Sequence, residues 1–306
     1  MKRTLAMILA LLLTLSLAAC AEPSGGEIRE PAQVTTGDST ENKQTGEPAE
    51  EPTKEPEKTE AAISETVLVD EAGVKITANS LADDGIFGPE LKLLIENDSG
   101  QDLTFQCGYA SVNGYMVDTM MSVDVVNGKK ANDSLTFMES SLTACDIDAI
   151  ADMEMTFHIF DTATWETYLD TAAILIRTSI ADTFAYTYDD SGDLAYEGND
   201  VKIVVKGLAE DDSIFGPSIV VYIENTGSLD IVVQTRDISI NGFMVDAIFS
   251  CEVVAGKRAL DTITFMDSDL EANAITAIED VELSFHIFDM AAWETIADTE
   301  AVRITF

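Results

Sequence analysis

Short runs in which apolar and polar residues alternate recur along the chain after residue 65. Residues 74–77 and 201–204 alternate with a period of two, whereas residues 91–96 and 219–224 are rich in aliphatic side chains and end at an asparagine. A period of two is typical of strands that bury one face, and turn residues separate the runs. The pattern therefore predicts an all-β chain of short strands.

A long alternating run, residues 153–159, indicates which side chains form the core. Met153, Met155, Phe157 and Ile159 occupy every second position, and we expect this face to point inward. A second run carries the same pattern at Val281, Leu283, Phe285 and Ile287.

Residues that favour turns separate the strands at corresponding positions in the two halves of the chain. Asn-Gly pairs at residues 113–114 and 241–242 favour tight hairpin turns, because both residue types tolerate positive φ. A second turn is expected at residues 127–130 and 255–258. Residues 140–150 and 268–278 open with residues that cap helices and predict one short helix in each half.

The chain contains two copies of one sequence. Residues 85–178 align with residues 213–306 without a gap, and about 46 of the 94 aligned positions are identical. A repeat of this length is long enough for a domain with its own core. We therefore expect one domain over residues 65–180 and a second over residues 193–306.

Seven to nine short strands in about 110 residues favour an immunoglobulin-like β-sandwich for each copy. Residues 91–97, 113–118 and 157–161 are also similar to the immunoglobulin-like domains of bacterial surface lipoproteins of unknown function. The resemblance covers both copies and supplies no catalytic residue.

The first nineteen residues have the features of an export signal. Lys2 and Arg3 precede an apolar stretch over residues 5–17, which is too short for a transmembrane helix. The four residues that end at Cys20 resemble the lipobox of bacterial lipoproteins. This implies cleavage before Cys20, lipidation of its thiol and anchoring at the extracytoplasmic face of the cell membrane. The alternative is ordinary cleavage after residues 19–21, which would release a soluble protein.

Residues 20–64 are expected to form a disordered tether. Glu, Pro, Thr, Gly and Lys dominate this stretch, and apolar residues are too few to form a core. Five of the seven prolines lie here, which favours an extended chain. They are Pro23, Pro31, Pro48, Pro52 and Pro56.

The charge of the chain excludes one class of partner. Its 17 Lys and Arg against 56 Asp and Glu give a net charge of -39. Such a chain repels the phosphate backbone, so we expect no nucleic-acid partner. Charged residues make up 24% of the chain, an ordinary share, so the acidity reflects an imbalance of sign.

Aromatic residues that recur in both copies are the candidate ligand-binding residues. Trp165 and Trp293 follow the last long strands, where an exposed indole could stack on a sugar or anchor a partner. More often, such a tryptophan closes one end of a sandwich. Phe87 and Phe215 lie in Ile-Phe-Gly-Pro loops, which either pack into the core or form an exposed apolar tip.

The histidines and cysteines give weak signals for catalysis or metal binding. His158 and His286 should lie on the outer face of their strands, and one histidine per copy makes a poor zinc site. Beyond Cys20, the cysteines are Cys107, Cys145 and Cys251, at positions that the other copy does not share. One bridge, between Cys107 and Cys145, is conceivable after export.

Acidic residues between the two copies are a candidate metal site. Asp189, Asp190 and Asp193 could bind calcium and stiffen the joint, although they do not match a complete calcium-binding loop. Solvated surface carboxylates are the alternative.

These observations favour a lipid-anchored, non-catalytic envelope protein whose two modules serve binding or adhesion. Its expected partners are the membrane, through the N-terminal lipid, and an envelope or extracellular ligand; we expect no cofactor. The alternatives are an envelope-associated hydrolase and a calcium-stiffened spacer.

Overall fold

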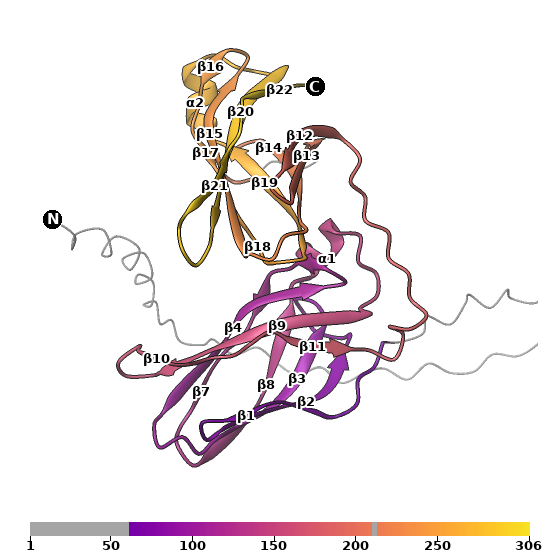
Figure 1. Cartoon of the computed structure of the whole chain (residues 1–306), viewed down its shortest axis with the longest axis vertical. Helices are drawn as coiled ribbons and strands as arrows, with labels where there is room; N and C mark the ends of the chain where they lie inside the picture. Colours follow the sequence, from indigo (N-terminus) through magenta and orange to yellow (C-terminus); the bar gives the residue numbers. More distant parts are fainter. Residues whose placement is uncertain (1–60, 210–212) are drawn as a thin grey trace, which may run out of the picture. The chain divides into compact units, whose positions relative to one another are not determined.

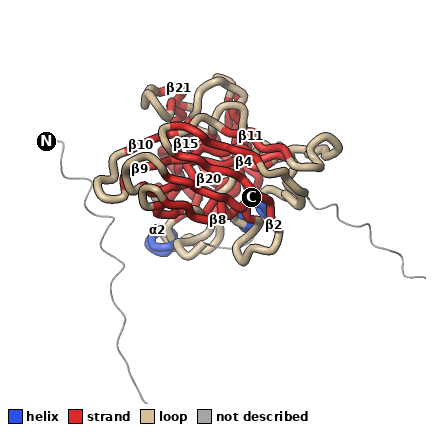
Figure 2. The backbone as a smooth tube through the Cα atoms, turned by 90° about the horizontal axis from the view of Figure 1, so that it is seen from below, coloured by secondary structure: helices blue, strands red, loops and turns tan. Residues whose placement is uncertain are grey.

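The computed structural model describes residues 61–209 and 213–306, and strands dominate them (Figure 2). The prediction of an all-β chain is confirmed. The part before residue 180 contains eleven strands and helix α1 (Glu139–Ala144). The strands are β1 (Thr66–Glu71), β2 (Val74–Ala82), β3 (Glu90–Asn97), β4 (Leu103–Val112), β5 (Tyr115–Met116), β6 (Thr119–Met120), β7 (Ser122–Val125), β8 (Lys129–Phe137), β9 (Asp152–Asp161), β10 (Thr167–Asp170) and β11 (Ile174–Arg177).

The part from residue 193 onward repeats this order of elements, with helix α2 (Asp267–Ala272). Its strands are β12 (Asp193–Gly198), β13 (Val201–Leu208), β14 (Ser218–Asn225), β15 (Ile231–Ile240), β16 (Phe243–Met244), β17 (Ala247–Ile248), β18 (Ser250–Val253), β19 (Arg258–Phe265), β20 (Asp280–Asp289), β21 (Thr295–Asp298) and β22 (Val302–Thr305). We call the two parts repeat 1 and repeat 2.

Each repeat forms a two-sheet, immunoglobulin-like sandwich (Figure 1). In repeat 1, one sheet has the order β1-β2-β3-β8-β6, and the other has the order β10-β9-β4-β5, with β7 paired to β4 and β11 to β9. In repeat 2, β12-β13-β14-β19 faces a sheet in which β15 and β20 are central. A single parallel bridge, Arg258 with Tyr115, connects β19 to β5.

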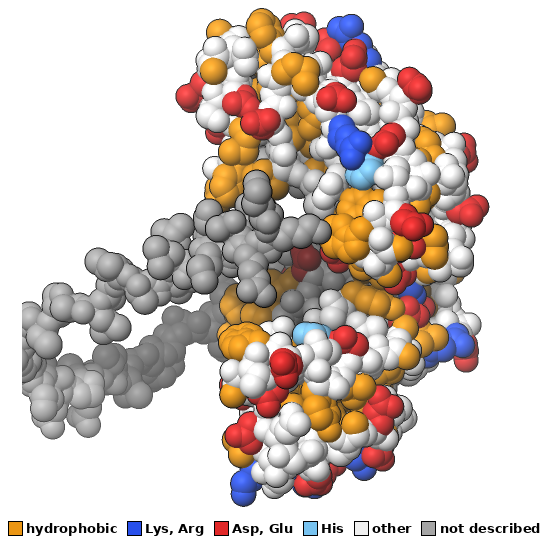
Figure 3. All heavy atoms as spheres, turned by 60° about the vertical axis from the view of Figure 1, so that its left-hand side comes forward, with side chains coloured by type: hydrophobic (Ala, Val, Ile, Leu, Met, Phe, Trp, Pro, Cys, Tyr) orange, Lys and Arg blue, Asp and Glu red, His pale blue; other side chains and the backbone are white. Residues whose placement is uncertain are grey.

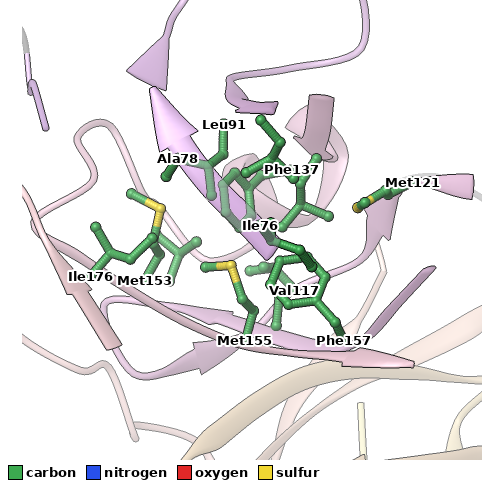
Figure 4. Close-up of a cluster of buried hydrophobic side chains, with 14 of the residues drawn as sticks. Ile76, Ala78, Leu91, Val117, Met121, Phe137, Met153, Met155, Phe157 and Ile176 are labelled. Carbon is green, nitrogen blue, oxygen red and sulfur yellow. The ribbon is translucent and has the colours of Figure 1, made fainter. Parts of the chain in front are cut away.

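The core of repeat 1 lies between its two sheets, as the alternation on β9 predicts. Met153, Met155 and Phe157 are at most 1% exposed and point toward Ile76 and Phe137 of the opposite sheet (Figure 4). The expected inward face is therefore confirmed. Burial of large apolar side chains on both inner faces holds the sheets together.

The expected turns form, and the helices are shorter than predicted. Asn113 (φ 49°) and Gly114 (φ 84°) both have positive φ between β4 and β5, which matches a primed hairpin turn. Gly128, in the second expected turn, has a φ of 72°. Each helix has six residues, so the ranges 140–150 and 268–278 overstate its length. The residues after each helix form a loop, which leads into β9 in repeat 1 and into β20 in repeat 2.

A buried asparagine fixes one loop at the same place in both repeats. In repeat 1, the side-chain amide of Asn97 donates hydrogen bonds to the carbonyl groups of Gln101 (2.8 Å) and Val125 (2.6 Å). Asn225 donates to the carbonyl groups of Leu229 and Val253 in the same way. The asparagines that end the apolar runs therefore tie β3 and β14 to the opposite sheet.

Candidate functional site

A row of four polar side chains crosses the outer face of one sheet in repeat 1. Strand pairing places Ser122 opposite Gln106, Gln106 opposite His158, and His158 opposite Asp170. The row thus spans β7, β4, β9 and β10. The side-chain amide of Gln106 donates to the Ser122 hydroxyl oxygen at 3.2 Å.

Repeat 2 has the same row with the same four residue types. Ser250, Gln234, His286 and Asp298 lie opposite one another across β18, β15, β20 and β21. The row recurs because the two repeats share both these residues and the register of their strands. A shift of one strand by one residue would move its side chains to the other face of the sheet.

The histidine of each row forms a short hydrogen bond with the aspartate. Nδ1 lies 2.6 Å from the carboxylate oxygen Oδ1 in both His158–Asp170 and His286–Asp298. Because a carboxylate accepts, Nδ1 carries the hydrogen and donates it. Among the described residues, no serine, threonine or cysteine side chain hydrogen-bonds to either ring. The pair thus lacks the nucleophile that a hydrolytic triad needs.

An aromatic stack extends from each histidine to an exposed tryptophan. The ring centroids of His158 and Phe160 lie 5.3 Å apart, and those of Phe160 and Trp165 lie 5.4 Å apart with an interplanar angle of 17°. Phe160 is buried beneath the indole, whereas Trp165 is 74% exposed. The indole is therefore held on one face and open to solvent on the other.

Repeat 2 reproduces the stack closely. The corresponding centroid distances are 5.2 Å for His286–Phe288 and 5.5 Å for Phe288–Trp293, and Trp293 is 76% exposed. We call residues 158, 160, 165 and 170 patch 1, and residues 286, 288, 293 and 298 patch 2. Figure 3 shows both histidine side chains at the surface, with acidic and hydrophobic side chains beside them.

A strained turn holds each tryptophan in place. Trp165 has a φ of 63°, and Trp293 a φ of 60°, in the left-handed region that favours glycine. The backbone N–H groups of Ala163 and Thr164 both donate to Oδ1 of Asp161, and these bonds hold the pKa of Asp161 below its usual value. A bulky residue in a strained conformation, repeated in both copies, is typical of functional surfaces.

The lysines in the strands of repeat 1 all lie on the sheet opposite patch 1. Strands β4, β7, β9 and β10, which surround patch 1, contain no Lys or Arg. The opposite sheet contains four lysines in its strands. These are Lys75, Lys92, Lys129 and Lys130. Strand β11 of the patch 1 sheet ends at Arg177, which pairs with Asp182, so among the described residues no Lys or Arg pairs with the residues of patch 1.

The Ile-Phe-Gly-Pro loops form exposed apolar tips, contrary to the commoner expectation that they pack into the core. Phe87 is 56% exposed and Phe215 49% exposed, and the preceding isoleucines are more exposed still. The loop backbone explains this outcome. Gly88 has a φ of 138°, and an added Cβ there would lie 2.1 Å from a backbone oxygen of Phe137, so the turn presses its glycine against the sheet and directs the side chains outward.

The cysteines of the described part form no disulfide. Cys107, Cys145 and Cys251 are all free thiols, so the conceivable bridge between Cys107 and Cys145 does not form. Burial raises the pKa of each thiol, to about 12 for Cys145. A thiol with a raised pKa is a poor nucleophile. All three line a cavity of about 640 Å³ that contains no histidine to act as a base.

The candidate calcium residues are engaged in other contacts. Lys206 Nζ lies 2.7 Å from Oδ2 of Asp189, and Lys202 pairs with Asp190. These ammonium groups lower the pKa of both carboxylates. Asp193 begins β12, and residues 61–209 and 213–306 contain no group of three or more acidic, histidine or cysteine side chains arranged to hold a metal ion.

The N-terminal predictions lie mostly outside the described residues. The signal peptide over residues 1–19, Cys20 and the tether up to residue 60 are among them. The last part of the expected tether is ordered: the backbone N–H of Ala62 donates to the Ser179 hydroxyl, and that of Ser179 to the Ala62 carbonyl. In the described ranges, every helix is too short or too polar to span a bilayer.

Comparison with known proteins adds little to these observations. No protein-family model and no curated protein sequence matches the chain. Among solved structures, the YadV chaperone is similar over 70% of this chain and 92% of its own, with 9% sequence identity and a TM-score of 0.23. A TM-score this low supports no inference about function.

Proposed function

We propose that the protein is a lipid-anchored, non-catalytic envelope protein that displays two modules and binds its partner through patch 1 and patch 2. The observation that carries the proposal is the repetition of the exposed, stacked tryptophan. Both copies keep a large apolar side chain in solvent, in a backbone conformation that disfavours it. An exposed tryptophan with a fixed orientation is a typical anchor in binding surfaces.

The described surroundings of the patches support binding over hydrolysis. Each histidine has an aspartate partner but no hydroxyl or thiol partner, and burial raises the pKa of the thiols. Anchoring through Cys20 rests on the lipobox resemblance, since two acyl chains hold a protein stably at a membrane.

Two measurements test the proposal. Labelled fatty acid should enter the full chain in an exporting bacterium, and Cys20→Ser should abolish the label. A release of unlabelled, mature protein into the medium would contradict the anchor.

The binding role is tested with the Trp165→Gly/Trp293→Gly variant of the full chain in detergent micelles. Each substitution removes the stacking contact but relieves the backbone, because glycine tolerates positive φ. We therefore expect the free energy of unfolding to change by less than about 1 kcal/mol per site. Immobilised wild type should retain components of a solubilised envelope fraction that the variant does not retain. Equal retention by the two proteins would contradict the role of the patches.

A further inference from the structure

The charge and shape of the patches identify the chemistry of the partner, an inference that rests on the proposed function. The partner has to offer a flat group to the open face of the indole. Phe160 covers the other face of Trp165 in a nearly parallel arrangement, so only one face is available, and its orientation is fixed. A planar group fits such a surface better than a bulky aliphatic one.

Each patch also has exposed carboxylates that accompany its tryptophan. Glu166 directly follows Trp165 and is exposed, and Asp170 lies in the same patch beside His158. Glu294 and Asp298 hold the same places in patch 2. Within the described ranges, neither glutamate forms a salt bridge, so each leaves its charge to solvent or to a ligand.

In the described part of the chain, Arg258 lies in such surroundings. The guanidinium carbon of Arg258 lies 3.7 Å from the centroid of the Tyr188 ring, and its Nη2 pairs with Glu224. The aromatic ring and the carboxylate together hold the planar guanidinium group of Arg258. Tryptophan is a stronger partner for a cation than tyrosine.

We propose that each patch binds an arginine side chain of a basic peptide segment in a partner protein. The guanidinium group stacks on the open face of the indole and donates hydrogen bonds to the neighbouring carboxylate, a geometry that its planar fork favours over the lysine ammonium. A net charge of -39 attracts such a segment from a distance and repels anionic ligands.

Intrinsic fluorescence tests the proposal at the patches themselves, because the chain has only two tryptophans, one in each patch. The probe is a tetra-arginine peptide with blocked ends, added to the full chain in micelles. Trp293→Gly leaves patch 1 as the only source of signal, and Trp165→Gly leaves patch 2. A tetra-citrulline peptide is the matched control, since it keeps the shape of arginine and lacks its charge.

We expect the arginine peptide to change the fluorescence of both single-tryptophan variants saturably, with an affinity that falls as salt is added. Glu166→Gln should weaken binding at patch 1 about fivefold, the size of one exposed ionic contact. Citrulline should bind at least about fivefold more weakly than arginine.

Three results would overturn the proposal: no fluorescence response to the arginine peptide, an equal response to citrulline, or a saturable response to a chito-oligosaccharide in place of the peptide. None of these would refute the proposed function if the envelope fraction still binds in a tryptophan-dependent way. Conversely, arginine binding without any tryptophan-dependent retention would leave the patch chemistry intact and contradict the function.

Discussion

Patch 1 and patch 2 share their aromatic stack and differ in charge. Asp298 in patch 2 accepts a hydrogen bond from Nη1 of Arg236 at 2.9 Å in addition to that from His286. The position equivalent to Arg236 in repeat 1 is Gly108, so Asp170 has only His158 as its partner among the described residues. The side chain of His286 is 13% exposed, against 38% for His158.

The same scaffold therefore supports two surfaces that share their aromatic residues and differ in charge. The guanidinium group of Arg236 lies beside patch 2 and neutralises part of its acidity, whereas the carboxylate of Asp170 in patch 1 pairs with His158 alone among the described residues. If the partner is cationic, patch 1 is the stronger site.

The largest expected effect is on stability, and it should be of similar size in the two repeats. Asn97→Ala and Asn225→Ala should each lower the free energy of unfolding by about 2–4 kcal/mol, because each removes several buried hydrogen bonds. Urea unfolding followed by hydrogen exchange would assign each loss to its repeat. A much smaller loss in one repeat would show that its loops are held by other contacts.

Removing the arginine beside patch 2 should strengthen the binding of a cationic peptide there. In the Trp165→Gly background, Arg236→Gly should raise the affinity of patch 2 for the tetra-arginine peptide about fivefold, because the internal cation is gone. Fluorescence titration measures the change. An unchanged affinity would show that Arg236 does not compete with the ligand.

Placing an arginine at the equivalent position beside patch 1 requires a second substitution. A Cβ at Gly108 would lie 2.5 Å from Oγ1 of Thr156. Serine can rotate its hydroxyl group away, as Ser284 does in repeat 2, where the hydroxyl donates to the Arg236 carbonyl group. The Gly108→Arg/Thr156→Ser variant should therefore fold and bind the peptide more weakly at patch 1. Thr156→Ser by itself is the control and should bind like the wild type.

A half-buried carboxylate in repeat 2, Asp261, predicts a pH-dependent contribution to stability. Burial raises the pKa of Asp261 above its ordinary value of 3.8, so the folded state disfavours its charged form. The stability that this group contributes is full below pH 3.8 and is lost as the pH rises through the folded-state pKa.

Asp261→Asn should consequently raise the melting temperature at neutral pH, and the gain should vanish at low pH. Thermal unfolding at several pH values measures it, with the equivalent substitution Asp133→Asn as the control. A gain that does not depend on pH would show that the charge is not the cause.

The smallest effect concerns the apolar tips. Ile86→Ser and Ile214→Ser should each change the free energy of unfolding by less than about 0.5 kcal/mol, because both side chains are more than 90% exposed. A loss of several kcal/mol in urea unfolding would mean that the tips pack in solution.

Much of the fold was predictable because its signals are local. Alternation at Met153, Met155, Phe157 and Ile159 gives the inward face directly, and the Asn-Gly pairs give the hairpin turns through their tolerance of positive φ. Comparison of the chain with itself gives the duplication. The recurrence of Trp165 and Trp293 marks them as candidates for binding.

The composition of the patches depends on contacts between segments that are far apart in the sequence. Asp170 follows His158 by twelve residues and Ser122 precedes it by thirty-six, and only the pairing of four strands brings them into one row. Likewise, only the fold shows that Trp165 lies in solvent on top of Phe160, and that Arg236 reaches Asp298. Strand register depends on contacts between distant segments, so the local pattern specifies which face a residue occupies but not which neighbours it meets there.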